Sequence, residues 1–201
     1  MTSALAITCT LKPSPSASSS DVLARQVLDE LAGHGVSGAV VRAVDHDIRP
    51  GVQRDMGDGD EWPDVLAKVR AADIVLLATP TWLGHMSSVA QRVLERLDAE
   101  LSQTDDEGRP AMLGKVALCA VVGNEDGAHK IIADVLGALG DIGFTVPAQG
   151  ATYWNDEAMG GRDYKDLERT PDAVATTTAD AARNAAHLAA VLRGSPYPPY
   201  R

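Results

Sequence analysis

Hydroxyl groups gather directly after the first apolar run of the sequence. That run, residues 5–9, leads through a short Ser/Pro-rich stretch into a helical pattern, and the polar side chains on the way include those of Thr10, Lys12, Ser16, Ser18, Ser19 and Ser20. A helix N-terminus has free N–H groups and a partial positive charge, so this loop could bind a phosphate dianion. An ordinary serine cap on a flexible connection is the alternative. The glycine patterns of dinucleotide folds and of P-loops are both missing here.

A second loop, residues 79–84, reads TPTWLG and follows another apolar run. Pro80 stiffens the turn, and Gly84 permits backbone angles that other residues avoid. The loop would present backbone N–H groups and the face of Trp82 to a flat ligand. A rigid turn in which Trp82 covers the edge of a sheet is the alternative.

A third loop, residues 123–127, follows the fourth apolar run and contains Gly123, Asn124, Asp126 and Gly127. Its glycines allow close backbone approach, although these residue types are common in any strand-to-helix turn. After the fifth run, Tyr153 and Trp154 add aromatic rings that we expect on the same rim.

The elements that must position these loops alternate between strands and helices. We expect buried strands at 5–9, 39–44, 74–78, 116–122 and 144–152, and helices at about 20–33, 62–69, 89–101, 131–139 and 171–192. This order predicts an α/β fold with an open parallel sheet covered on both faces. Ligands of such sheets bind outside the carboxyl ends of the strands, where all of these loops would lie. Residues 45–61 and 153–170 are read as long polar loops.

Composition restricts the partners. The chain has 201 residues and a net charge of -10, which argues against nucleic acid and against anionic membrane surfaces. We expect one domain over 1–201 with an extended tail at 194–201. No signal peptide or membrane span is recognised, so a cytoplasmic protein is expected. Only eight residues are aromatic (three Trp, four Tyr, one Phe), so the core must be aliphatic.

The two cysteines, Cys9 and Cys119, lie in or beside apolar runs, which is typical of buried thiols in a reducing compartment. If the strand order is 2-1-3-4-5, their strands are two places apart, about 9.6 Å. A disulfide needs Cα atoms within about 7 Å, so none is expected. We expect no metal ligands.

The loop motifs resemble those of a known family. TPTWLG at 79–84, followed by His85, Met86, Ser87 and an amphipathic helix, is similar to the isoalloxazine-binding loop of flavodoxin-like FMN flavoproteins, specifically the NAD(P)H-dependent FMN reductase and multimeric-flavodoxin quinone reductase group. Residues 16–20 correspond in position to the phosphate loop of that group, and 123–127 to its second flavin loop. The resemblance covers about residues 5–152. It implies a flavodoxin-like, doubly wound five-stranded parallel sheet of order 2-1-3-4-5, bound FMN, and a homodimer or tetramer.

The resemblance also implies roles for residues. Where members often have a Gly-Ser-Pro-Arg opening, this chain has Thr10 to Pro13, so Lys12 would replace the arginine at the phosphate. The serines would hold the phosphate. A backbone N–H within the second loop would bond the flavin N5, and the third loop would border the pyrimidine edge. The FMN ligands implied are Thr10, Lys12, Ser16, Ser18, Ser19, Ser20, Pro80, Thr81, Trp82, Leu83, Gly84, Gly123, Asn124, Asp126 and Gly127, with Tyr153 and Trp154 toward the substrate.

The expected function is hydride transfer from NAD(P)H through bound FMN to a quinone or a similar flat acceptor. The flavin performs this chemistry, so no nucleophile is needed, and His85 or His129 could donate a proton. Both histidines could equally be polar loop residues. An acidic electron-transfer protein without its own small substrate, and a flavin-free structural or regulatory member of the fold, are the alternatives.

Overall fold

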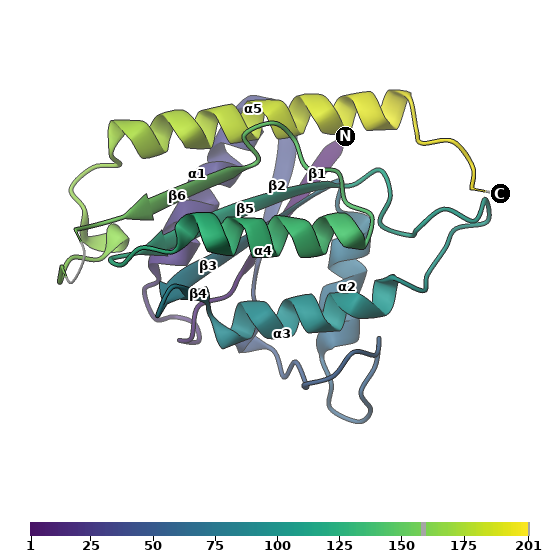
Figure 1. The fold of residues 1–201 in the computed structure, drawn as a ribbon, viewed down its shortest axis with the longest axis horizontal. Coiled ribbons are helices and arrows are strands. Elements are labelled where there is room, and N and C mark those ends of the chain that lie inside the picture. Colours follow the sequence, from purple (N-terminus) through teal and green to yellow (C-terminus); the bar gives the residue numbers. More distant parts are fainter. Residues whose placement is uncertain (158–159, 201) are drawn as a thin grey trace.

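A computed structural model describes residues 1–157 and 160–200 and shows a parallel sheet with helices on both faces (Figure 1). The strands are β1 Thr2–Thr8, β2 Val36–Arg42, β3 Ile74–Trp82, β4 His85–Met86, β5 Val116–Gly123 and β6 Ala151–Asn155. The order β2-β1-β3-β5-β6 confirms the expected flavodoxin-like topology. The two-residue β4, which pairs antiparallel with the end of β3, was not expected.

The strands differ from the expected ranges at their ends. β3 continues four residues further, through Trp82, so the TPTWLG motif lies partly in the sheet. The expected strand at 144–152 was wrong over its first part: Thr145 forms only an isolated bridge, and β6 begins at Ala151. Pro147 lacks the N–H that a ladder needs, and Gln149 has a φ of 56°, which is not a strand conformation.

Within the described residues, five helices cover the sheet: α1 Ser19–Gly33, α2 Trp62–Ala71, α3 Ser88–Leu97, α4 Ala128–Asp141 and α5 Asp172–Gly194. α2, α3 and α4 pack on one face with Leu5 and Ile7, while α1 and α5 pack on the other with Ala4 and Ala6 (Figure 1). Alternate side chains of each strand therefore serve two separate aliphatic cores. The third helix ends earlier than expected, because the chain tightens into a 3-10 turn, η2 Asp98–Glu100, and leaves Leu101 exposed.

Both cysteines are buried free thiols, as expected. β3 separates β1 from β5, so the thiols do not meet. Burial raises the pKa of Cys119 to about 12 and raises that of Cys9 as well, which keeps both protonated. In the tail, residues 195–200 form no helix or strand. The Tyr197 hydroxyl forms a hydrogen bond with that of Thr145, and the Tyr197 carbonyl accepts one from Arg109. Arg201 lies outside the described residues.

A buried ion pair organises the long loop between β2 and α2. Arg96, from α3, bonds both carboxylate oxygens of Asp60 at 2.9 and 2.7 Å, and neither side chain is exposed to solvent. Arg96 also donates to the carbonyls of Arg49 and Gln53, and its guanidinium lies over the ring of Trp62. Burial opposes the charge on Asp60, but bonds from Arg96 and from three backbone N–H groups hold its pKa well below the usual range. One guanidinium therefore fixes a loop that has little regular structure.

We expect Asp60→Asn to reduce the free energy of unfolding by about 3–5 kcal/mol, because it leaves a buried guanidinium without its counter-charge. Asp134→Asn, which breaks the exposed pair with Lys130, should cost about 0.5 kcal/mol or less. Urea unfolding measures both. Because the folded-state pKa of Asp60 is lowered, its contribution should be lost as the pH falls below 3.8, its ordinary value, and Asp60→Asn should lack that part of the acid sensitivity. Equal losses in the two variants would contradict this role of the pair.

Candidate functional site

A cavity of about 350 Å³ opens at the carboxyl edge of the sheet, between the ends of β1, β3 and β5. Its size is that of a small-molecule site. The sequence-predicted residues that line it are Thr10, Lys12, Ser18, Ser19, Ser20, Pro80, Thr81, Trp82, Gly123, Asn124 and Trp154. The three loops and the fifth strand therefore meet at one place, as the topology requires.

Other predicted residues lie beside the cavity without lining it. The carbonyl of Ser16 points to Arg42, and Leu83 and Asp126 are exposed. Gly84 and Gly127 hold the second and third loops together: a Cβ on Gly127, whose φ is 122°, would lie 2.7 Å from the Cα of Gly84. These glycines therefore serve the contact between two loops.

β6 separates the two aromatic residues that we expected on one rim. Trp154 is 7% exposed, lines the cavity and packs against Tyr164. Tyr153 points to the other face of the sheet, where its ring meets that of His129 edge-on at 5.1 Å. The pleat causes this, because both residues lie inside β6 rather than after it. The structure thus brings Trp154 to the cavity and not Tyr153.

One end of the cavity is the N-terminus of α1. Ser18 caps the helix by accepting from the N–H of Asp21, and Ser19 accepts from the N–H of Lys165 at 3.3 Å. Each hydroxyl oxygen thus has a backbone donor, which leaves the hydroxyl proton to donate. Ser20, which is 3% exposed, lines the same end. Hydroxyl donors beside free helix N–H groups are suited to an anion.

The other end is a slot with an unpartnered polar atom. Thr81 is 4% exposed, lines the cavity, and has no hydrogen-bond partner for its Oγ1. Gly123 faces it so closely that a Cβ there would lie 2.8 Å from the Thr81 Cβ. Trp82 stands at the mouth, 55% exposed. A buried hydroxyl without a partner is costly.

Ser87 connects the anion-binding end of the cavity, at the start of α1, with the slot at Thr81. Its hydroxyl, 1% exposed, donates to the carbonyl of Cys9 at 2.6 Å and accepts from the N–H of Ala90, which caps α3. Its own N–H donates to Oγ1 of Thr79 at 3.1 Å. The ends of β1 and β3 and the start of α3 are therefore fixed to each other by one side chain.

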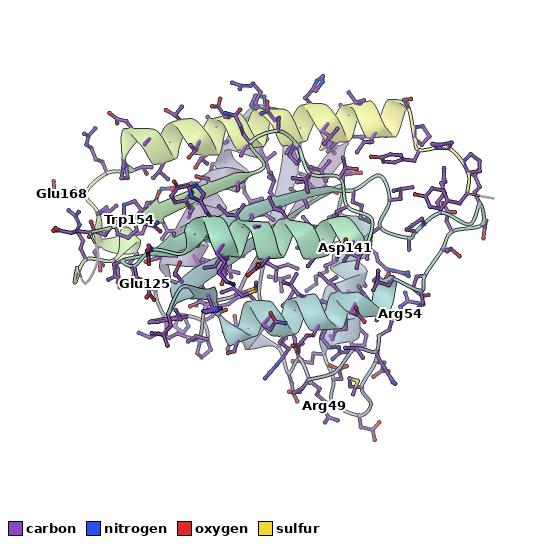
Figure 2. All side chains as sticks on the ribbon, viewed as in Figure 1. Arg49, Arg54, Glu125, Asp141, Trp154 and Glu168 are labelled. Atoms are coloured by element: carbon purple, nitrogen blue, oxygen red, sulfur yellow. The ribbon has the colours of Figure 1, made fainter. Side chains whose placement is uncertain are left out.

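One of the backbone N–H groups that we expected to bond the flavin N5 already has a partner within the protein. The N–H of Leu83 donates to the carboxylate of Glu125 at 2.7 Å, so Glu125, which the sequence reading missed, ties the second loop to the third. Figure 2 shows Glu125 and Trp154 at the same end of the molecule, far from Arg49. His85 Nδ1 lies 2.7 Å from the Leu83 carbonyl, and a carbonyl can only accept, so this nitrogen holds the proton. Neither His85 nor His129 lines the cavity.

The sequence reading also missed part of the cavity wall. Asp163, Tyr164 and Lys165 line it, although 153–170 was read as a polar excursion. A tyrosine and a lysine together in an acidic chain poor in aromatics were the available signal. Leu11, Ala17 and Val122 complete the lining, and small or apolar residues of this kind carry no signal of their own.

The residues present fit a flavin mononucleotide. Ser18, Ser19 and Ser20 with the α1 N-terminus would hold its phosphate, and Pro80, Thr81, Trp82 and Gly123 would border its ring. When bound, FMN supplies hydride acceptance and donation. The chain's own residues would orient the ring and bond its polar edges. Fold and site together define a flavodoxin-like protein whose cavity fits FMN.

The chain belongs to the NADPH-dependent FMN reductase family, whose sequence model matches residues 3–158. It is therefore an enzyme of an FMN-dependent oxidoreductase family. Among curated proteins it is 35% identical to 8-demethyl-8-aminoriboflavin-5'-phosphate synthase of Streptomyces davaonensis, over 96% of this chain and 79% of that protein.

A second curated relative, the divalent metal cation transporter MntH of Mycobacterium bovis, is 41% identical over 81% of this chain. The chain spans only 24% of that protein's length, so transport is not carried over. Over 1–157 and 160–200, no helix combines the length and apolar character needed to cross a bilayer.

Two solved structures support the fold. RosB with bound 8-demethyl-8-formylriboflavin-5'-phosphate has a TM-score of 0.89 and 33% identity, and the match covers 98% of this chain and 82% of that one. An NADH:FMN oxidoreductase (EMOB) in its apo form has a TM-score of 0.67, with coverage of 98% and 92%. At 19% identity, this second structure supports the fold alone.

We expect Ser87→Ala to lower the free energy of unfolding by about 2–3 kcal/mol, because it removes a helix cap and leaves the buried Cys9 carbonyl unpaired. FMN affinity should fall as well, since the two ends of the site lose their link. The exposed neighbour provides the control: Ser88→Ala should change stability by about 0.5 kcal/mol or less. Urea unfolding and FMN titration measure these effects. A Ser87 variant that behaves like the Ser88 variant would refute the link.

Proposed function

We propose that this protein is an NAD(P)H-dependent FMN oxidoreductase that passes hydride through bound FMN to a small flat acceptor such as a quinone. The observation that carries the proposal is the cavity itself, with hydroxyl donors at the α1 N-terminus at one end and Pro80, Thr81 and Trp82 at the other. This pairing matches a ligand with an anion at one end and a flat polar ring at the other.

The exposed rim supports an acceptor site. Trp82 and Leu83 are 55% and 87% exposed next to the cavity, which leaves apolar surface where a flat molecule could stack. We infer that a second copy of the chain, in a homodimer or tetramer, covers part of this rim. The buried free thiols support a location in a reducing compartment such as the cytoplasm.

A second function is favoured by the relatives. One is a synthase of a modified riboflavin phosphate, and RosB was solved with a riboflavin-phosphate intermediate bound. A flavin phosphate would then occupy the same cavity as the substrate that is changed rather than as the carrier that is recycled. The residues that bind it would be the same, so only the products distinguish the two functions.

Purified protein mixed with FMN should show flavin absorbance that stays with the protein on gel filtration, and it should oxidise NADH or NADPH faster when a quinone is added. A pure electron carrier would bind FMN but oxidise almost no NAD(P)H without a separate reductase. Mass spectrometry of the flavin after turnover separates reductase from flavin-modifying enzyme, because only the second changes the flavin's mass. A protein that stays colourless with added FMN would overturn every flavin function.

Trp82→Ala should weaken binding of the flavin or of the acceptor by roughly tenfold, through loss of the aromatic contact at the mouth, and should leave stability nearly unchanged. FMN titration and the acceptor KM measure the first effect, and thermal unfolding the second. Tyr200→Ala removes a similarly exposed ring that does not line the cavity and serves as the control. Unchanged affinity and KM would show that Trp82 only covers the sheet edge.

A further inference from the structure

The 3-10 turn η3 Tyr164–Asp166, together with Asp163, forms an unforeseen wall of the cavity, and we refer to residues 163–166 as the outer wall. It lies beyond residue 158, where the match to the family model ends, in the connection between β6 and α5. Yet Asp163, Tyr164 and Lys165 line the same cavity as Ser18, Ser19 and Ser20. A segment beyond the family-model match therefore lines the same cavity as the serines at the start of α1.

Tyr164 anchors the outer wall to α1. Its hydroxyl donates to Gln26 at 2.5 Å, its ring packs 5.4 Å from that of Trp154, and it is 3% exposed. Gln26 in turn donates to Thr170 just before α5. Burial raises the pKa of Tyr164, so its hydroxyl remains a neutral donor. The wall is therefore held in place by a buried aromatic residue rather than by surface contacts.

Lys165 is the cation of the outer wall. Its N–H donates to Ser19, and its ammonium lies 2.7 Å from carboxylate oxygens of both Asp163 and Asp166. An ammonium has three protons, so one remains after these two bonds. The two carboxylates are 53% and 60% exposed, and exposed ion pairs of this kind are weak. A phosphate at the α1 N-terminus could accept a hydrogen bond from the remaining ammonium N–H and compete with the carboxylates for the other two.

We propose that the outer wall selects flavins that carry a 5′-phosphate. The Lys165 ammonium contacts the phosphate. The backbone N–H of Lys165 bonds the Ser19 oxygen, which leaves the Ser19 hydroxyl proton to donate to the phosphate. Asp166, which does not line the cavity, competes with the phosphate for Lys165. Lys12 also lines the cavity, so Lys165 adds a second lysine to the one that the sequence predicted at the phosphate. The proposal rests on the proposed function, because it requires a flavin phosphate in this cavity.

The test compares dissociation constants for FMN and riboflavin, measured by quenching of flavin fluorescence. Lys165→Gln should weaken FMN roughly tenfold and leave riboflavin unchanged, because only FMN carries the phosphate. Lys165→Arg should keep most of the preference for FMN. Asp166→Asn should act in the opposite direction and tighten FMN alone, since it releases the ammonium. Lys130→Gln and Asp134→Asn, from an exposed ion pair on α4, are the matched controls and should change neither constant.

The outcomes separate the two proposals. Equal weakening of FMN and riboflavin by Lys165→Gln would show that the wall only packs against the ligand and would overturn the inference. Unchanged FMN binding in both Lys165→Gln and Asp166→Asn would overturn it too, while the proposed function stood. Failure of the unaltered protein to bind either flavin would overturn both. If Lys165→Gln does not fold by circular dichroism, the Lys165→Arg and Asp166→Asn results decide.

Discussion

The hydrogen bond from the Ser87 hydroxyl to the Cys9 carbonyl is the constraint on which the site depends. Parallel strands bring their carboxyl ends to one edge, but they do not fix the loops that leave that edge. Ser87 does so, because the same buried side chain caps α3 and meets Thr79 on β3. The phosphate end and the ring end of the cavity thus keep a fixed separation, which a ligand with an anion and a rigid ring requires.

Much of the scaffold was predictable because it follows from periodicity. Short aliphatic runs alternating with amphipathic helices specify a doubly wound sheet, and the topology then places the loops after β1, β3 and β5 together. One miss occurred where a single residue changes the backbone. Because Pro147 cannot take part in the ladder, β6 begins only at Ala151. Tyr153 and Trp154 therefore lie within the strand and point to opposite faces of the sheet. A pattern of residue types does not reveal such a shift of register.

The parts of the site that could not be predicted are joined through space. Glu125 reaches Leu83 across 42 positions, and Lys165 reaches Ser19 across 146. Ser87 was visible only as one more hydroxyl near a helix start. A side chain whose role is to bond a distant backbone group has no local signature, since its partner is defined only by the folded chain. Sequence reasoning therefore located the loops but not what orients them.

The chain carries a net charge of -10, yet its site is suited to a phosphate. The resolution is that neutral donors act at short range, whereas net charge acts over a screened distance of about 8–10 Å. The serine hydroxyls and N–H groups at the start of α1 act locally together with Lys12 and Lys165, and Lys165 is itself paired with Asp163 and Asp166. The acidic surface repels free anions in general. A ligand that also fills the slot at Thr81, Gly123 and Trp82 makes enough further contacts to bind despite this repulsion. Charge and shape together, rather than charge alone, define the ligand.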